Sequence, residues 1–163
     1  MCSILGIIDF KEKIKTKNHI IQNINKTLEH RGPDDEGYYN DEIVSLGFNR
    51  LSIIDLKQGN QPIINNNVVS IFNGEIFNFK KLKNELENLG FSFKTRSDSE
   101  VINLAYQAWG PNFIKKCEGM FSIAIYDKKI KKIFLYRDRV GIKPLFFYFK
   151  NEVFIFSSEV KGI

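Results

Sequence analysis

The chain has few of the residues from which metal centres and disulfide frameworks are built. Its 163 residues include only two cysteines, Cys2 and Cys117, and two histidines, His19 and His30. Without a C-x-x-C pair, two cysteines do not make a disulfide framework, and structural zinc sites need four Cys or His ligands. The sequence therefore predicts no metal site, histidines that are structural or solvent-facing, and a reduced Cys117 in or near the core.

Long hydrophobic runs are also absent. The opening apolar run, residues 4–8, is far shorter than the roughly 20 residues of a membrane-spanning helix, and no basic leader precedes it. We therefore expect no signal peptide, no contact with a membrane and a cytoplasmic location.

Positive charge is in excess but is not concentrated. The formal net charge is +5, and the lysines are scattered over residues 11–17, 80–83 and 128–132. Scattered runs of this kind are typical of solvated surfaces, whereas nucleic-acid binding needs a basic patch on one face. The sequence therefore predicts no nucleic-acid partner, and a salt-sensitive mobility shift with DNA or RNA would contradict this.

The chain lacks internal repeats, and its hydrophobic pattern predicts one α+β layered domain over residues 1–163. A chain of this length with 43% hydrophobic residues can bury about two-thirds of its unfolded surface. Periodicity predicts strands over 3–9, 43–49, 68–72, from 119 onward, 132–137, 145–149 and 152–157. It predicts helices over 18–30, after Asn78 as far as Gly90, and from a capping box of Ser97 and Glu100 to Trp109. Antiparallel hairpins with interspersed helices favour the α+β layered class.

Cys2 directly follows the initiator Met1. Removal of Met1 would leave a thiol and a free α-amine on one residue, and so a nucleophile beside its own base. Free thiols titrate near pKa ~8.5 and terminal amines near ~7.7 to 8.0, so roughly a tenth to a fifth of such amines can accept a proton at neutral pH. A direct bond from thiol to amine within one residue is strongly bent, so we expect a bridging water to carry the proton. Taken alone, a cysteine at position 2 is also compatible with no function.

Six short motifs resemble one family along the whole chain. They are residues 1–7 (MCSILGI), 30–34 (HRGPD), 50–56 (RLSIIDL), 73–78 (NGEIFN), 97–101 (SDSEV) and 137–145 (RDRVGIKPL). Each is weak alone, but their common order resembles class II glutamine amidotransferase domains, and more narrowly the amino-terminal half of glutamine-hydrolysing asparagine synthetase. Ser3 departs from the family pattern, in which glycine is frequent, but it is also a small residue.

The resemblance implies an N-terminal-nucleophile hydrolase fold, a four-layer αββα sandwich of two antiparallel sheets between helices. It implies that Cys2 attacks the side-chain amide of L-glutamine, releasing ammonia and leaving a thioester that water hydrolyses to glutamate. The Asn73 side-chain amide and the Gly74 backbone N–H would stabilise the oxyanion, a contribution of about 10² to 10³ in rate for one donor. All three residues are therefore predicted to be catalytic.

The resemblance also implies how the two charged ends of an amino acid would be bound. Arg50 would bind the α-carboxylate and Asp98 the α-ammonium. The remaining predicted pocket residues are Leu51, Ser52, Ile53, Ile54, Asn73, Gly74 and Glu75. Taken singly, Asp98 is equally compatible with a favourable charge at a helix N-terminus, Arg50 with a surface charge, and Asn73-Gly74 with a type I′ hairpin turn.

Two further motifs, residues 30–34 and 137–145, are interpreted as structural turns, with Arg31 as a candidate support for the terminal amine. The resemblance implies that both lie near the active site or toward the synthetase domain. The family's Ser-Gly-Gly-x-Asp-Ser pyrophosphate-binding loop does not occur in the sequence. We therefore expect only the ammonia-releasing half-reaction and no cofactor in this domain, with ATP and Mg²⁺ belonging to a synthetase domain or partner chain. A fragment, a shortened gene product and a separate subunit all stay open, as does a homodimer. The alternative function is a glutamine-binding or interaction module with little turnover.

Overall fold

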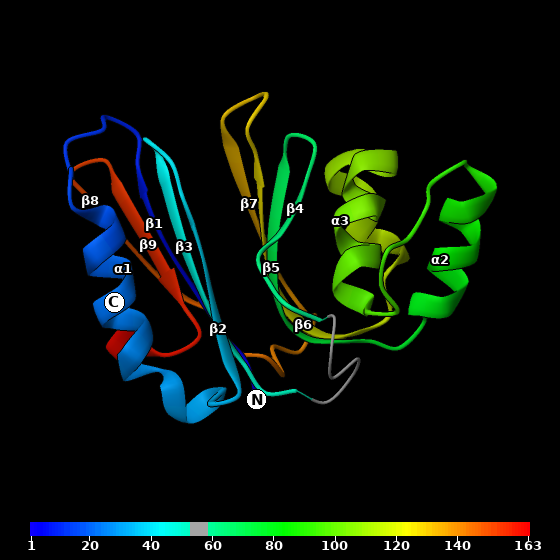
Figure 1. Cartoon of the computed structure of the whole chain (residues 1–163), viewed down its shortest axis with the longest axis horizontal. Helices are drawn as coiled ribbons and strands as arrows, with labels where there is room; N and C mark the ends of the chain where they lie inside the picture. The colour runs from blue at the N-terminus through cyan, green and yellow to red at the C-terminus, as the bar shows by residue number, and fades with distance from the viewer. Residues whose placement is uncertain (53–58) are drawn as a thin grey trace.

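Two antiparallel sheets pack face to face in the computed structural model, which describes residues 1–52 and 59–163 (Figure 1). The first sheet has the strand order β2 (Asp35–Asn40), β3 (Val44–Arg50), β1 (Ser3–Asp9), β9 (Val153–Ser157) and β8 (Phe146–Lys150). The second has the order β4 (Ile63–Asn65), β5 (Val68–Ile76), β6 (Gly119–Asp127) and β7 (Lys132–Arg137). The helices are α1 (Lys17–Thr27), α2 (Phe79–Asn88) and α3 (Asp98–Trp109), with short 3-10 turns η1 (Glu29–Arg31), η2 (Gly110–Lys116) and η3 (Val160–Gly162).

Helices cover the outer face of each sheet. On the first sheet, Ile21 and Leu28 pack with Leu5 and Ile7 of β1. On the second sheet, α3 packs on β5 and α2 packs on α3, with Phe113 fully buried in this cluster. Figure 1 shows the resulting order of helix, sheet, sheet and helices from left to right. The predicted four-layer αββα arrangement is confirmed.

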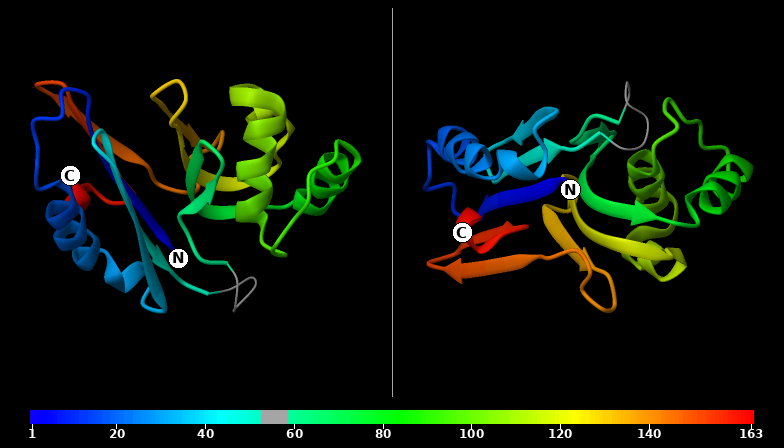
Figure 2. Two further views of the ribbon diagram at one scale, coloured as in Figure 1. Left: turned by 45° about the horizontal axis from the view of Figure 1, so that its top comes forward. Right: turned by 90° about the horizontal axis from the view of Figure 1, so that it is seen from below.

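Strand β1 is central to the first sheet and is buried along all seven residues. Its alternate side chains enter two different cores, since Ile4 and Ile8 lie between the sheets whereas Leu5 and Ile7 face α1. Burying each aliphatic side chain contributes about 1.5–3 kcal/mol, so this strand is strongly fixed. Cys2 precedes it directly, and the views in Figure 2 place this end of the chain between the two sheets.

The structure corrects several predicted boundaries. Strands β2 and β4 were not predicted, and β5 continues to Ile76 instead of ending at residue 72, because it stays paired with β6 as far as Gly119. Asn73 and Gly74 therefore lie within a strand, and the hairpin-turn interpretation is wrong. Helix α1 ends at Thr27, after which the chain tightens into the 3-10 turn η1.

The predicted capping box is only half correct. Ser97 is the N-cap of α3 and accepts a hydrogen bond from the Ser99 backbone N–H. The Glu100 carboxylate accepts instead from the backbone N–H groups of Lys94 and Thr95, in the loop before the helix. Asn78 occupies the N-cap position of α2, but its side chain bonds to the backbone of residues 116 and 118 rather than to the helix.

In the described ranges, 1–52 and 59–163, none of the helices has the length and apolar character required to cross a bilayer.

Candidate active site

The Cys2 side chain is half-buried at the entrance to β1 and lies against the chain segment that leaves β3. Its Sγ is 3.4 Å from the backbone nitrogen of Leu51, which donates to it, and 3.6 Å from the Leu51 carbonyl oxygen. The Cys2 carbonyl oxygen accepts a hydrogen bond of 3.1 Å from Arg31 Nε. The two contacts of the sulfur are weak hydrogen bonds, and the Arg31 contact holds the Cys2 backbone, so the half-buried sulfur is positioned but not strongly bonded.

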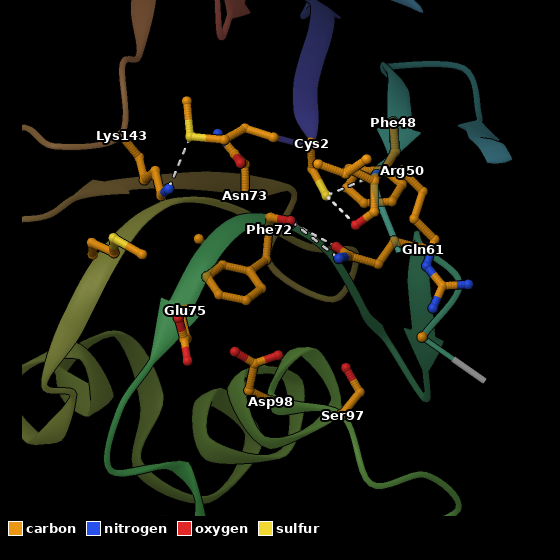
Figure 3. Close-up of a pocket in the computed structure, with 15 residues that line it drawn as sticks. Cys2, Phe48, Arg50, Gln61, Phe72, Asn73, Glu75, Ser97, Asp98 and Lys143 are labelled. Atoms are coloured by element: carbon orange, nitrogen blue, oxygen red, sulfur yellow. Dashed lines mark hydrogen bonds between the residues drawn. The ribbon is translucent and has the colours of Figure 1, made fainter. Parts of the chain in front are cut away.

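A cavity of about 110 Å³ lies in front of Cys2 (Figure 3). Most of the predicted site residues that the structure describes line it, namely Cys2, Arg50, Leu51, Asn73, Gly74, Glu75 and Asp98. Ser52 is not part of this lining, and its backbone N–H donates to the Asp34 carboxylate at 2.7 Å. Ile53 and Ile54 lie outside the described residues.

Asn73 presents an unsatisfied donor in this region. The residue is 2% exposed, and its Nδ2 has no hydrogen-bond partner in residues 1–52 and 59–163. An unpaired buried donor costs about 1–3 kcal/mol, and such groups are rare unless they serve a function. The Asn73 amide can therefore donate to an oxygen that enters the cavity.

The next residue, Gly74, lies where only glycine fits. Its φ is +153°, and a Cβ at this position would overlap the backbone carbonyl of Met120 on the neighbouring strand. The absence of a side chain lets β5 and β6 approach closely at a residue that lines the cavity.

Two buried side chains of opposite charge lie on different walls of the cavity (Figure 3). Arg50, at the end of β3, is 5% exposed, and its Nη1 donates to Asn60 at 2.6 Å. Asp98, the first residue of α3, is equally buried and accepts from the Ile76 backbone N–H at 3.1 Å. The interpretation of Arg50 as a surface charge is therefore wrong.

Burial raises the pKa of Asp98 to about 6, and the nearby charge of Glu75 acts in the same direction. Hydrogen bonds from backbone N–H groups oppose this shift without cancelling it. A cation placed beside Asp98 would favour its ionised form, so the carboxylate is suited to binding a positively charged group.

The structure adds Lys143 to the cavity wall, although the motif that contains it, residues 137–145, is interpreted from the sequence as a structural turn. Asp138 accepts hydrogen bonds from the backbone of Phe121, Ile142 and Lys143, which hold its pKa below the usual range although burial acts to raise it. The resulting fixed loop directs Lys143 inward, with Nζ 3.0 Å from the sulfur of Met1 (Figure 3). The motif at residues 137–145 identifies the loop, but no local pattern distinguishes this lysine within it, because the direction of its side chain depends on the fold of the whole loop.

Gln61 is a second lining residue without a sequence signal. Its side chain accepts from the Phe72 backbone N–H at 2.6 Å and donates to the Phe72 carbonyl at 3.1 Å. The Gln61 side chain thereby bonds to the Phe72 backbone of β5 as a neighbouring strand would, and it fixes the cavity wall next to Asn73.

The predicted structural role of residues 30–34 has a clear physical basis. Pro33 forms a parallel bridge with Arg50, and the Asp34 backbone N–H donates to the Arg50 carbonyl at 3.0 Å. This segment therefore supports the strand end that carries Arg50.

Across the residues that the structure describes, no three His, Cys, Asp or Glu side chains are grouped so as to hold a metal ion.

Comparisons with known proteins show which proteins the chain resembles in sequence. The chain is 45% identical over 167 residues to asparagine synthetase [glutamine-hydrolyzing] 2 of Bacillus subtilis (strain 168), and the match covers 100% of this chain and 22% of that protein. It is 36% identical to asparagine synthetase B [glutamine-hydrolyzing] of Escherichia coli (strain K12), covering 100% of this chain and 30% of that protein. The chain thus spans less than a third of the length of either relative.

A solved structure shares the fold. The glutamine phosphoribosylpyrophosphate amidotransferase of B. subtilis, in complex with ADP and GMP, superposes with a TM-score of 0.80 at 20% identity. The superposition covers 99% of this chain and 42% of that one, and it confirms the predicted N-terminal-nucleophile hydrolase fold.

The family model described as "Glutamine amidotransferase domain" matches residues 1–163. The predicted resemblance to the glutamine-hydrolysing asparagine synthetases is also confirmed, since they match over the whole chain. The chain therefore belongs to the glutamine amidotransferase domain family.

Proposed function

We propose that the chain hydrolyses L-glutamine to glutamate and ammonia through a thioester on Cys2. The observation that carries this proposal is that four groups line one cavity. They are the Cys2 thiol, the Asn73 amide donor that has no partner in the described part of the chain, and two buried side chains of opposite charge, Arg50 and Asp98. These are the groups that cleavage of the side-chain amide of a zwitterionic amino acid requires.

The proposed reaction begins with removal of Met1, which leaves Cys2 with a free α-amine. The thiol attacks the carboxamide carbon of glutamine, and its proton passes through a water to the amine. The Asn73 Nδ2–H and the Gly74 N–H stabilise the oxyanion. The carbon–nitrogen bond then breaks, ammonia leaves with the proton held by the amine, and a glutamyl thioester remains. Water hydrolyses this thioester to glutamate and regenerates the thiol.

Recognition of glutamine would use the two charged walls of the cavity. The Arg50 guanidinium would bind the α-carboxylate, and the Asp98 carboxylate would accept hydrogen bonds from the α-ammonium. Leu51 and Glu75 line the cavity around these contacts, whereas Ser52 does not, and the predicted contribution of Ile53 and Ile54 lies outside the described residues. The separation of the two charges along the cavity would direct the carboxamide toward Cys2.

The proposed half-reaction needs no cofactor, because the chain itself supplies the nucleophile, the base and the oxyanion donors. The ammonia would pass to a synthetase domain or a partner chain, in which ATP and Mg²⁺ would be used. The alternative is a module that binds glutamine but turns over little. The Asn73 donor, which has no partner among the residues that the structure describes, favours the enzyme, because binding alone requires no oxyanion site.

Glutamate release and labelling of Cys2 test the proposed function together. The purified chain is incubated with glutamine, and glutamate and ammonia are measured; a second sample is treated with a glutamine-mimicking electrophile and its intact mass determined. We expect the assay to yield glutamate and ammonia in equal amounts. The intact mass should show one adduct on a chain that lacks Met1, and excess glutamine should slow its formation. Glutamine binding without glutamate above the blank would establish the binding module instead.

Binding of glutamine is expected to depend on pH through Asp98. Since its pKa is about 6 in the free protein, lower pH protonates the carboxylate and removes its attraction for the α-ammonium. We expect the Kd for glutamine, measured by calorimetry on a Cys2→Ala variant, to be constant near neutral pH and to rise about tenfold per unit below about pH 6.

The matched control for this titration is Asp98→Asn in the same Cys2→Ala background. It should bind glutamine weakly and without the pH dependence, since the asparagine does not titrate. An unchanged Kd in the Asp98 protein from about pH 7 to about pH 5 would show that this carboxylate does not bind the ammonium group.

A further inference from the structure

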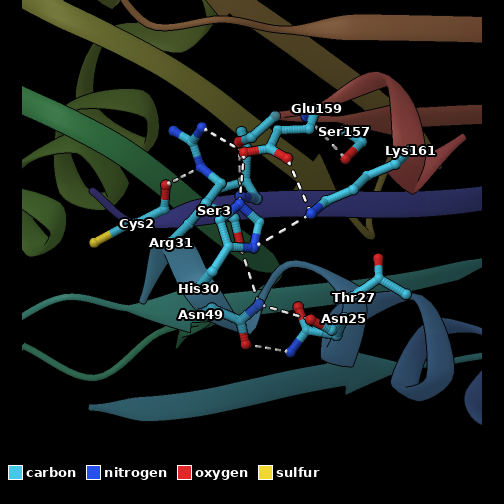
Figure 4. A network of polar contacts seen from close by, with 12 residues as sticks. Cys2, Ser3, Asn25, Thr27, His30, Arg31, Asn49, Ser157, Glu159 and Lys161 are labelled. Carbon is cyan, nitrogen blue, oxygen red and sulfur yellow. Dashed lines mark hydrogen bonds and ion pairs between the residues drawn. The ribbon is translucent and has the colours of Figure 1, made fainter. Parts of the chain in front are cut away.

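A cluster of charged side chains outside the cavity connects the segment after β9 to Cys2 (Figure 4). At its centre is Glu159, between β9 and η3. Its Oε1 lies 3.0 Å from Arg31 Nη1 and 2.9 Å from His30 Nε2, and its Oε2 lies 3.4 Å from Lys161 Nζ. One carboxylate is therefore surrounded by three basic side chains.

The Arg31 guanidinium continues this cluster to the nucleophile. While its Nη1 binds Glu159, its Nε donates to the carbonyl oxygen of Cys2 at 3.1 Å. A guanidinium is planar and rigid, so holding one of its nitrogens sets the direction of the others. The Glu159 carboxylate thereby controls the hydrogen bond that Arg31 makes to Cys2.

Arg31 depends on Glu159 for charge compensation. The Arg31 side chain is only 10% exposed, and its Nη2 has no hydrogen-bond partner in the described part of the chain. Glu159 is its single ion-pair partner among those residues. A buried guanidinium without a carboxylate is costly, so loss of the Glu159 charge would favour movement of Arg31 away from the Cys2 carbonyl.

Glu159 stays ionised over the range in which a glutaminase would work. Burial acts to raise its pKa, but the hydrogen bonds from Arg31 and His30 prevail and hold the pKa at about 2. The neighbouring residue, Ser158, is bonded to β1, because its Oγ accepts from the Ile4 backbone N–H at 3.0 Å. The segment that carries Glu159 is thus itself fixed to the strand that Cys2 precedes.

We propose that Glu159 is a positioning residue for the nucleophile, which orients Arg31 so that Arg31 holds the Cys2 carbonyl and keeps the sulfur facing the cavity. The expected effect of Glu159 on turnover rests on the proposed function. The expected effect of Glu159 on the position of Cys2 does not depend on turnover. A misplacement of about 1 Å at a reacting group can cost about a hundredfold in rate.

The test compares Glu159→Gln with the wild-type chain. We expect kcat for glutamate release to fall about ten- to a hundredfold, with KM nearly unchanged, because the glutamine contacts on Arg50 and Asp98 are untouched. Alkylation of Cys2 by iodoacetamide, followed by peptide mass analysis, should slow as well. This labelling can be measured whether or not glutamine is turned over, so failure of the proposed function and failure of the positioning role are distinguishable.

Glu85→Gln is the matched control. Glu85 is also paired with a cation, at 2.8 Å from Lys116 Nζ, and its side chain is 35% exposed against 27% for Glu159, but it lies on α2 away from the cavity. We expect this variant to keep wild-type kcat and labelling. Arg31→Lys retains the charge but not the forked geometry of the guanidinium. If Glu159 acts through Arg31, the double variant with Arg31→Lys and Glu159→Gln should have a kcat only slightly below that of the slower single variant.

Two outcomes would overturn the positioning role. One is wild-type kcat and wild-type labelling of Cys2 in Glu159→Gln. The other is a fall in kcat that merely follows the unfolded fraction in a thermal melt, because that result would show that Glu159 stabilises the fold and does not position Cys2.

Discussion

A Cys2→Ala variant is expected to bind glutamine with near wild-type affinity but to release glutamate at least about 10⁴-fold more slowly, because removal of the nucleophile removes the whole covalent route. The fold should survive the substitution, since the polar contacts of the Cys2 side chain within residues 1–52 and 59–163 are two weak ones with the Leu51 backbone. Steady-state glutamate release and calorimetric titration with glutamine measure the two quantities separately.

Cys117→Ala is the control for this experiment. Cys117 packs against the core around α3, and burial raises the pKa of its thiol to about 12, so it is protonated and unreactive at neutral pH. We expect this variant to keep wild-type turnover per folded molecule. Activity that survives in Cys2→Ala and disappears in Cys117→Ala would refute the assignment of the nucleophile.

The parts of the fold that could be predicted are those whose local pattern and tertiary environment agree. Strand β1 is an example, because its continuous apolar residues fit a strand that is buried on both faces. The start of α3 at Ser97 is another, since the serine side chain caps a free backbone N–H of the helix.

Strand β5 shows why other parts could not be predicted. Asn73, Gly74 and Glu75 are unfavourable in strands, yet all three lie in β5 because β6 pairs with it along its whole length. The site depends on this pairing, which outweighs the low strand propensity of these residues, since the extension of β5 brings Asn73 and Gly74 to the cavity beside Cys2. Family resemblance, and not propensity, identified these two residues.

Contacts between distant residues limited the prediction of the site in the same way. Glu159 and Arg31 are 128 positions apart, and Lys143 is 142 positions from Met1. Neither pair has a local signature, because each is formed by the sheets that bring the chain segments together. Gln61 reaches the backbone of Phe72 across a shorter separation, but its role as a substitute strand partner is equally invisible in the sequence.

The second large effect is expected from Asn73→Ala, which should lower kcat for glutamate release by about 10² to 10³, or ~2.7 to 4 kcal/mol, with little change in KM. The reason is that the negative oxygen exists only in the tetrahedral intermediates, so the amide contributes to the transition state far more than to the bound substrate. Because Asn73 Nδ2 has no partner in the described part of the chain, the substitution should cost little stability.

Asn103→Ala separates catalysis from stability in this comparison. Asn103 is equally buried, but its Nδ2 bonds to Ser70 Oγ at 2.9 Å and lies within 3.4 Å of the Val68 carbonyl oxygen. Its loss should lower the free energy of unfolding by about 1–3 kcal/mol and leave kcat per folded molecule unchanged. The two asparagines should therefore show opposite patterns in a denaturant titration and a kinetic assay. If Asn73→Ala instead lost stability like Asn103→Ala and kept its kcat, the Asn73 amide would be a structural group and the oxyanion would have to be stabilised elsewhere.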